Sequence, residues 1–531
     1  MSEPAVCRAA AIALAGLEGS PVFVEAALSQ QLPGIGIVGL PDTALAEAKS
    51  RVRVATEKVG LKLADRFILI NLAPAALPKH GSGFDLAIAL AALAASGRAP
   101  AARMSSVVHL GELALDGELR RPPGLLGAVL AARRLGFERV MVPESAAVES
   151  SLVPGIETIA VRDLADAVAW HSGEDRTWRI VTPGSSARPT EQARTHDRCG
   201  AEPTHPRPDG TPDMADIIGQ DEAVEALVVA AAGRHHLSLT GPPGAGKTLL
   251  AACLPTILPD LNPEESLVAS SIASLGGDTL RRLVVRPPFE HPHHTASAIA
   301  IIGGGDGRGV RPGAVTRACH GVLFLDEAAE YPRHVLDALR QPLESGTVDI
   351  HRARFRATLP AKAQLLLASN PCPCGNAGSL DAAAECTCTP IARMRYRSRI
   401  SGPLSDRIDL KIEVRRVSSV QEPTAGAANR TSAELRSRVT RARARAAERL
   451  RGTPWVVNSD LPGQWLRGPA AKLPRSETVV LDRALALGAL TLRGYDRALR
   501  VAWTLADLAE IDRPGRREIA HALILREGDL T

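Results

Sequence analysis

The stretch that decides the fold is Gly241-Pro242-Pro243-Gly244-Ala245-Gly246-Lys247-Thr248. The stretch His236-Leu237-Ser238-Leu239-Thr240 predicts a short buried strand before it, and the apolar run at 249–254 predicts the start of a helix after it. A glycine-rich turn of this spacing, between a strand and a helix, is typical of loops that bind nucleotide phosphates. The alternative is an incidental glycine-rich turn, and the two flanking elements argue against it.

Every residue of this phosphate loop, 241–248, is expected to take part in nucleotide binding. Backbone N–H groups between the glycines can surround the β-phosphate, and the following helix adds the partial positive charge of its N-terminus. Lys247 would reach the β- and γ-phosphates, and the Thr248 hydroxyl would be a ligand of Mg²⁺. The sequence therefore predicts ATP and Mg²⁺ as cofactors.

Polar residues also follow the ends of two further predicted strands. The apolar residues 322–325 predict a buried parallel strand that ends at Asp326 and Glu327. The carboxyl ends of parallel strands are where ligands bind, so Asp326 would hold Mg²⁺ through water and Glu327 would polarise the attacking water. The run at 364–369 predicts another strand, and Asn370 at its end could orient that water. Such a carboxylate pair is a weak signal alone and gains its weight from the phosphate loop before it.

Four of the eight cysteines form two close pairs, Cys372 with Cys374 and Cys386 with Cys388. Four thiols in paired spacing can form a tetrahedral Zn²⁺ site of structural type. The C-x-C spacing is tighter than the usual C-x₂-C of zinc sites. Structural zinc and free or redox-sensitive thiols therefore both stay open.

Two other stretches attract attention for their charge. Residues 286–297 are rich in histidine, but no carboxylate or thiol is spaced to complete a metal shell there. Residues 432–451 predict a helix with arginines on all sides, which is either a solvated face or a nucleic-acid contact.

Composition sets the broad class of the protein. The chain has 531 residues, enough for about three domains, with a formal net charge of +5 and 3% aromatic residues. No signal segment and no long uncharged apolar run is evident, so we expect a cytoplasmic protein that does not contact a membrane. The fold class indicated is multi-domain α/β.

The chain divides into four regions. Residues 1–175 alternate apolar runs and helical stretches, with a strand expected at 67–72, helices at 84–95 and about 125–135, and a hairpin turn at Asp116-Gly117. Residues 176–212 are rich in Pro, Gly and Ser and predict a flexible linker. The ATPase core is expected at 213–423, and a C-terminal helical part at 424–531.

The first region resembles the Lon-protease-like, S5-type domain at the front of ComM/YifB proteins. The motifs that carry the resemblance are G-L-P-D-T at 39–43, N-L-A-P at 71–74, L-P-K-H-G-S-G-F-D-L at 77–86 and G-E-L-A-L-D-G-E-L at 111–119. Ser82 suggests a peptidase nucleophile, but the position where active domains carry a lysine base has Leu125, Leu126 and Ala128. A serine without a base is a poor nucleophile, so a non-catalytic, structural or docking role is expected.

The resemblance extends to the core, where L-x-D-R-I-D at 404–409 is similar to the arginine-finger segment of magnesium-chelatase-like AAA+ ATPases. It implies a P-loop α/β/α core with a parallel sheet, followed by a helical lid. It also implies that Arg407 completes the nucleotide site of a neighbouring subunit in a ring, usually of six. A local ion pair of Arg407 with Asp406 or Asp409 is the alternative. T-x-R at 491–493 suggests Arg493 as a sensor of the γ-phosphate.

The family match, which runs nearly end to end, implies a ring-forming ATPase that acts on DNA. Its expected activity is ATP-dependent branch migration or unwinding, during recombination and natural transformation. Arg308 and Arg311, on the glycine-rich stretch 303–313, would then face the centre of the ring and touch a phosphate backbone, unless this is a plain solvated loop. Two alternatives remain: a chelatase-like ATPase chaperone that remodels a protein partner, and an adaptor that docks through its front domain.

Overall fold

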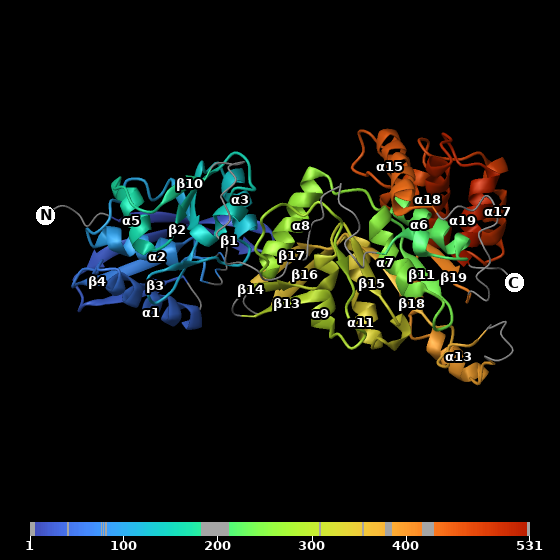
Figure 1. Ribbon diagram of the computed structural model, residues 1–531, viewed down its shortest axis with the longest axis horizontal. Helices are drawn as coiled ribbons and strands as arrows, with labels where there is room; N and C mark the ends of the chain where they lie inside the picture. Colours follow the sequence, from blue (N-terminus) through green and yellow to red (C-terminus); the bar gives the residue numbers. More distant parts are fainter. Residues whose placement is uncertain are drawn as a thin grey trace.

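The computed structural model describes residues 6–39, 42–75, 77, 79, 82–181, 212–306, 309–352, 355–377, 385–416 and 430–527. Most of the predicted linker, residues 417–429 and Arg308 lie outside these residues. Figure 1 shows three regions in a row, with the N-terminal domain at one end and the C-terminal helices at the other. The molecule is therefore elongated, and the two chain ends lie far apart.

The N-terminal domain is built on an eight-stranded mixed sheet in the order β10-β9-β8-β5-β1-β2-β4-β3. Its strands are β1 (Cys7–Ala15), β2 (Glu18–Ser29), β3 (Gly34–Val38), β4 (Phe67–Ala73), β5 (Val107–His109), β8 (Arg139–Pro143), β9 (Glu157–Val161) and β10 (Arg179–Val181). The small hairpin β6 (Glu112–Leu113) and β7 (Leu119–Arg120) turns at the predicted Asp-Gly. Because β10 pairs with β9, the sheet continues past residue 175 into the stretch expected to be linker.

The helices of this domain are α1 (Asp42–Lys58), α2 (Asp85–Ala95), α3 (Leu125–Arg134), α4 (Ala147–Ser150) and α5 (Leu164–Ser172). Ten of the eleven residues of α2 are buried, as its all-round Ala/Leu/Ile composition requires. It packs on β1 and β2. The predicted helices at 84–95 and 125–135 and the strand at 67–72 are thus confirmed to within a residue at each end.

The central domain contains a five-stranded sheet in the order β12-β15-β18-β11-β19, and all its strand pairs are parallel. The strands are β11 (Leu237–Thr240), β12 (Phe289–Glu290), β15 (Val322–Leu325), β18 (Gln364–Ser369) and β19 (Leu410–Glu413). Every residue of β15 and β18 is buried, which fits strands covered on both faces. The expected parallel sheet of an AAA+-like core is therefore present.

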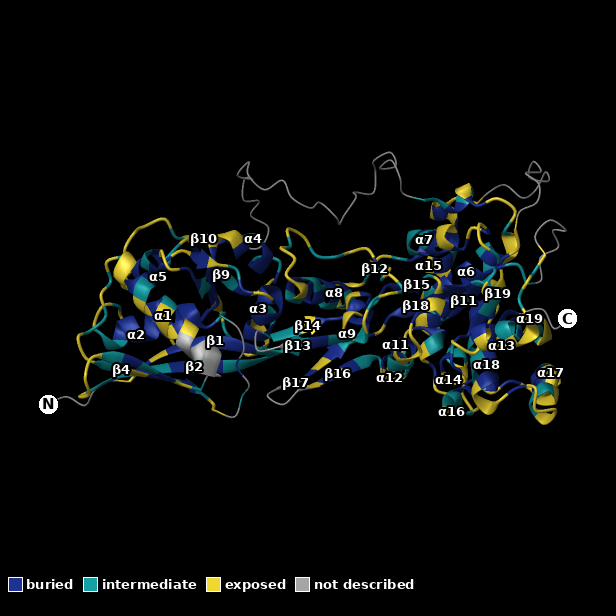
Figure 2. Ribbon diagram, turned by 90° about the horizontal axis from the view of Figure 1, so that it is seen from below, coloured by how far each residue is buried: buried dark blue, intermediate teal, exposed yellow. Residues whose placement is uncertain are grey.

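Helices and two hairpins surround this sheet. The helices are α6 (Asp221–Gly233), α7 (Lys247–Ile257), α8 (Pro263–Gly276), α9 (Ala298–Ile302), α10 (Ala314–Arg317), α11 (Arg333–Ala338), α12 (Arg340–Ser345), α13 (Pro390–Arg397) and α14 (Gly402–Ser405). The hairpins are β13 (Gly303–Asp306) with β14 (Gly309–Pro312), and β16 (Thr347–Arg352) with β17 (Phe355–Pro360). Figure 2 shows both hairpins on the side of the central domain that faces the N-terminal domain.

The C-terminal region consists of α15 (Ser432–Arg449), α16 (Gly463–Leu466), α17 (Arg475–Ala486), α18 (Leu492–Leu508) and α19 (Arg516–Glu527). Helices α15 and α18 pack on α6, and α19 packs on β19. One apolar cluster joins residues of these helices, such as Val439 and Ala498, to Leu237 and Leu250 of the central domain. The C-terminal helices therefore share their core with the central sheet. None of the helices found within the described residues has the length and apolar character needed to cross a membrane.

The N-terminal and central domains meet where α3 packs against the end of α8. Arg121 donates hydrogen bonds to the carbonyl oxygen of Asp278 at 2.6 Å and to Ser274 Oγ at 3.2 Å. The same guanidinium is paired with the fully buried Glu149 at 2.5 Å. A cation at the C-terminal end of a helix is favourable, so Arg121 links the two domains.

Candidate nucleotide site

The phosphate loop lies between β11 and α7, as the sequence predicts. Gly246 has a φ of 88° at the residue before α7, a left-handed conformation that L side chains rarely adopt. The Gln220 amide donates to the carbonyl oxygen of Arg415 at 2.5 Å and to that of Ala245 in the loop at 3.4 Å. The segment before α6 therefore braces the loop.

Lys247 connects the phosphate loop to the neighbouring strand. Its ammonium donates to the carbonyl oxygens of Gly241 at 2.7 Å and Pro242 at 2.9 Å, and to Asn370 Oδ1 at 3.1 Å. Asn370 reaches this point because β18 is hydrogen-bonded beside β11. Burial lowers the pKa of Lys247, and the charges of Asp326 and Glu327 oppose that shift. The cation is thus held at the carboxyl edge of the sheet.

Thr248 and Asp326 form the second pair of the site. The Thr248 hydroxyl donates to Asp326 Oδ2 at 2.8 Å. A hydroxyl and a carboxylate oxygen converging at the phosphate loop are the donor set that Mg²⁺ takes from protein in nucleotide sites, so the residues present fit this ion. When bound, Mg²⁺ supplies charge neutralisation on the phosphates.

Glu327 is held in an unusual conformation. Its φ of 49° is left-handed, which is rare outside glycine and is often found at functional sites. Its backbone N–H donates to Asp326 Oδ1 at 2.9 Å, and its Oε2 lies 3.1 Å from His294 Nδ1. The carboxylate is therefore oriented by His294, which belongs to the histidine-rich segment 286–297 that was weighed above as a metal site.

Of the other histidines in this segment, His291 packs against β15 and His293 bonds a residue within the segment. The His291 ring lies 4.6 Å from the Phe324 ring between centroids, and His293 Nδ1 lies 2.8 Å from the Thr295 hydroxyl. Tyr331 donates to the carbonyl oxygen of Pro292 at 2.5 Å. These contacts hold the segment in place beside Glu327.

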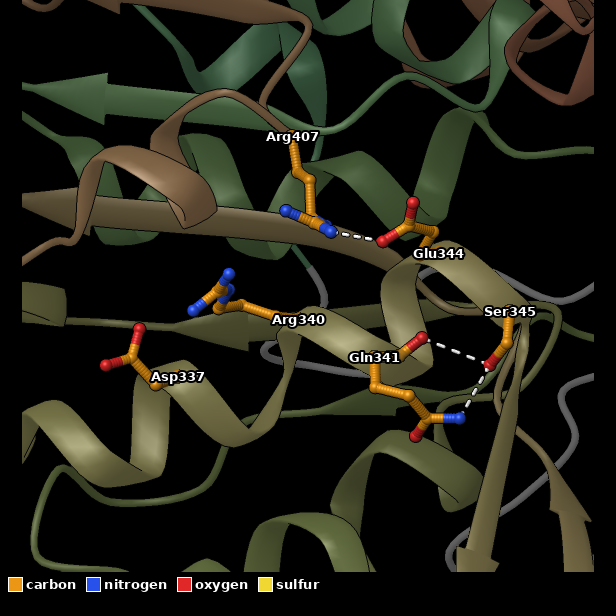
Figure 3. A pocket seen from close by; sticks show the side chains of 6 residues that line it. All are labelled: Asp337, Arg340, Gln341, Glu344, Ser345 and Arg407. Atoms are coloured by element: carbon orange, nitrogen blue, oxygen red, sulfur yellow. Dashed lines mark hydrogen bonds and ion pairs between the residues drawn. The ribbon is translucent and has the colours of Figure 1, made fainter.

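Arg407 lies away from the phosphate loop, in a pocket of about 430 Å³ lined by residues of α11 and α12. Figure 3 shows Arg407 and Arg340 on two sides of this pocket, with Glu344 paired to Arg407. The Arg407 guanidinium also donates to the carbonyl oxygen of Pro403 at 2.7 Å. Its ion pair is thus with Glu344, neither with Asp406 nor with Asp409.

The three arginines at the start of α18 have different surroundings. Arg497 pairs with Asp409 at 2.5 Å, and Arg500 donates to the carbonyl oxygen of Leu461 at 2.7 Å. Arg493, in the first turn, is exposed, and within the described part of the chain its side chain has no hydrogen-bond or ion-pair partner. Of the three, Arg493 is the one available to a ligand.

The arginines of α15 are engaged within the molecule. Arg438 pairs with Glu225, and Arg443 donates to the carbonyl oxygen of Ala231 at 2.7 Å. The remaining ion pairs are Arg436–Asp260, Arg441–Glu510, Arg445–Asp512, Arg449–Asp507 and, just after the helix, Arg451–Glu448. This pattern favours a packed and solvated helix over a nucleic-acid contact.

One group of metal-ligating side chains stands out among the described residues: Cys372, Cys374, Cys386 and Cys388. Their sulfur atoms all lie within 4.8 Å of one another. The cluster is compatible with the zinc site that the sequence left open.

The fold and the site together define a P-loop nucleotide-binding protein with an AAA+-like core. Family models described as "Magnesium chelatase, subunit ChlI", "Subunit ChlI of Mg-chelatase" and "Magnesium chelatase, subunit ChlI C-terminal" match residues 213–422, 24–146 and 429–526.

Full-length relatives are also found. An uncharacterized protein of Mycobacterium tuberculosis (strain H37Rv) is 43% identical over 98% of this chain and 99% of its own. The uncharacterized protein YifB of Escherichia coli K12 is 36% identical over 97% and 96% of the two chains. Competence protein ComM of Haemophilus influenzae is 37% identical over 96% and 95%. The chain belongs to the ComM/YifB family of magnesium-chelatase-like proteins.

Proposed function

We propose that this protein is a ring-forming, cytoplasmic ATP hydrolase that drives DNA branch migration or unwinding, in recombination and natural transformation. The observation that carries the ATPase part is the convergence of Lys247, Asn370, Thr248 and Asp326 at one edge of the sheet. The DNA part is supported by the likeness to a protein named for competence.

The pocket around Arg407 supports a ring in which each subunit completes the next one's site. Arg407 comes from elements other than those that carry the phosphate loop, and only 12% of its side chain is exposed. Its partner Glu344 is 63% exposed at the side chain, so an incoming γ-phosphate could replace that carboxylate at little cost. Head-to-tail contacts of this kind close into rings, for which we propose six subunits.

The hairpin β13–β14 is the proposed DNA contact. It carries the exposed Arg311 and joins α9, which follows the His294 segment directly. Arg308, the other arginine named from the sequence, lies outside the described residues. Its exposed position on a glycine-rich hairpin supports Arg311 as a phosphate contact.

The test is ATP hydrolysis by the full chain with no DNA, single strands, duplex and a four-way junction. We expect a several-fold rise in rate, largest with single-stranded or branched DNA and abolished in Lys247→Ala. In an Arg308→Ala/Arg311→Ala variant the stimulation is lost while basal hydrolysis persists.

A second function is favoured by the family descriptions themselves, which name a magnesium chelatase subunit. In that case the ring would remodel a protein partner. Vigorous hydrolysis that is indifferent to every DNA would contradict the motor and support this alternative.

A further inference from the structure

Four cysteine sulfurs converge beside the nucleotide site from two separate pairs. Cys372 Sγ lies 3.3 Å from Cys374 Sγ and 3.6 Å from Cys386 Sγ, and Cys374 Sγ lies 3.6 Å from Cys386 Sγ. All four, Cys388 included, fit within 4.8 Å. A tetrahedral Zn²⁺ with Zn–S bonds of about 2.3 Å separates its sulfurs by about 3.8 Å, whereas a disulfide brings two sulfurs to about 2.05 Å. The arrangement therefore matches four thiolates around one ion.

The surrounding backbone is shaped to hold such a centre. The Gly375 N–H donates to the carbonyl oxygen of Cys372 at 3.0 Å, and the Ala377 N–H donates to the Cys372 sulfur at 3.3 Å. On the other side, Arg393 of α13 donates to the carbonyl oxygen of Cys388 at 3.1 Å. Hydrogen bonds to ligand sulfurs and to the chain beside them orient the ligands of metal sites.

The segment between β18 and α13 has no helix or strand in the residues described there, 370–377 and 385–389. Of these four cysteines, only Cys372 is buried. Because the described residues of this connection have no helix or strand to order them, they need another source of order. A metal that binds both cysteine pairs supplies it.

This segment rests directly on the phosphate loop. A Cβ atom placed on Gly375, whose φ is 83°, would lie 2.5 Å from Cδ of Pro243. Pro371, one residue before the first cysteine, follows Asn370, which accepts the hydrogen bond from Lys247. The Arg397 side chain donates to the carbonyl oxygen of Pro371 at 3.4 Å. In Figure 1, α13 stands off the edge of the central domain, and the cysteine segment is one of the two connections that join it there.

We propose that Cys372, Cys374, Cys386 and Cys388 bind one Zn²⁺, and that the resulting zinc knuckle buttresses the phosphate loop through the contact of Gly375 with Pro243. The ion is structural, since all four coordination positions are filled by protein thiolates and no position is left for water or substrate. Its effect on ATP is exerted through the position of the phosphate loop and of Asn370.

The first experiment measures metal in the full-length protein, purified without a metal-affinity tag, by elemental analysis. We expect one Zn²⁺ per chain, lost in Cys386→Ser/Cys388→Ser and retained in Cys7→Ala, which removes a buried thiol in β1. Metal-free protein with reactive thiols, or iron with visible absorbance, overturns the zinc assignment.

The second experiment measures affinity for a fluorescent ATP analogue. Removal of zinc from the wild-type chain with a chelator and a thiol-modifying agent should weaken binding of the ATP analogue by roughly tenfold. This loss is comparable to the effect of removing outer-shell hydrogen-bond partners at metal sites. This route avoids relying on a cysteine variant that fails to fold. Gly375→Ala adds only the Cβ atom that meets Pro243 and is less strained at a φ of 83° than a β-branched residue would be. This variant should keep its zinc and also bind ATP more weakly. Zinc removal that leaves nucleotide affinity unchanged would contradict the proposal that the zinc site supports the phosphate loop. Because both readouts are made without DNA, they are independent of the proposed motor activity.

Discussion

At the residue scale, the orientation of Glu327 depends on its contacts with Asp326 and His294. Asp326 accepts from its backbone N–H, and His294 contacts its carboxylate. We expect His294→Ala to lower kcat for ATP by roughly tenfold with KM nearly unchanged. The Glu327 carboxylate, which is proposed to polarise the attacking water, would then be wrongly oriented but still present. Steady-state kinetics checks this.

The neighbouring histidine offers a matched control. His293 bonds Thr295, and its ring lies 4.1 Å from the His294 ring between centroids, but it has no ion pair with Glu327 among the described residues. His293→Ala should therefore lower kcat clearly less than His294→Ala does. His294→Asn, which keeps a donor of similar reach, should recover part of the rate. Equal losses in the His293 and His294 variants would show that the segment acts only through packing.

Much of the nucleotide site could be predicted from sequence because its residues occupy fixed positions after strands. Lys247, Thr248, Asp326 and Asn370 meet because β11, β15 and β18 are neighbours in one parallel sheet. His294 has no such fixed position. It reaches Glu327 from an irregular segment after β12, a strand too short to stand out in the sequence.

At the scale of elements, Asp409 joins the central sheet to the C-terminal helices. It accepts from Arg497 of α18 at 2.5 Å and from the backbone N–H of His236 at 3.0 Å, with 2% of its side chain exposed. Burial alone would raise the pKa of Asp409, but the charge of Arg497 holds it well below its ordinary value.

Removing one partner of such a pair leaves a buried charge. Asp409→Ala should therefore cost the central and C-terminal unit about 3–5 kcal/mol of unfolding free energy, measured by native-state hydrogen exchange. Asp512→Ala, which removes the fully exposed partner of Arg445, should leave the free energy of unfolding nearly unchanged. Equal costs for the two changes would mean that Asp409 is not an anchor of the helices.

A buried histidine pair makes the N-terminal domain sensitive to acid. His109 Nε2 lies 3.0 Å from His171 Nε2. Burial and the charge of His171 lower the pKa of His109 to about 3, and burial lowers the pKa of His171 to about 4. The unfolded chain then binds more protons than the folded chain from about pH 6.5 downward, so stability is full above this pH and is lost as pH falls toward 4.

At pH 5 the loss should be on the order of 2 kcal/mol for each histidine. We expect His109→Gln to reduce the slope of unfolding free energy against pH between about pH 7 and 5. His521→Gln, on an exposed position of α19, should leave the slope unchanged. A slope that is the same in the His109 variant and the wild type would contradict a neutral buried pair.

Elements with a clear local sequence pattern could be predicted, whereas elements held by tertiary contacts could not. The apolar helix α2 and the arginine-rich helix α15 were predicted to within two residues at each end. The hairpins β13–β14 and β16–β17 were not, since their glycine and charged residues carry no clear alternation. The arginines of α15 could not be assigned from sequence, because their acidic partners come from distant parts of the chain.

At the scale of the whole molecule, the contact of Arg121 with the end of α8 links the N-terminal domain to the central domain. Arg121→Ala should speed amide exchange in the last turn of α8 and the first turn of α3, because the carbonyl contacts are lost and Glu149 is left buried and unpaired. Arg139→Ala is the control, since its partner Glu157 is 34% exposed. Protection that stays at the wild-type level in Arg121→Ala would mean that packing alone holds the two domains together.

The measurement that tests the motor most directly is the fate of a labelled four-way DNA junction on incubation with the full chain and ATP. We predict that the wild-type protein converts the junction to duplex or single-stranded products only when ATP is hydrolysed. Lys247→Ala and Arg407→Ala should leave it intact. A wild-type protein that hydrolyses ATP while the junction stays whole would contradict the DNA motor.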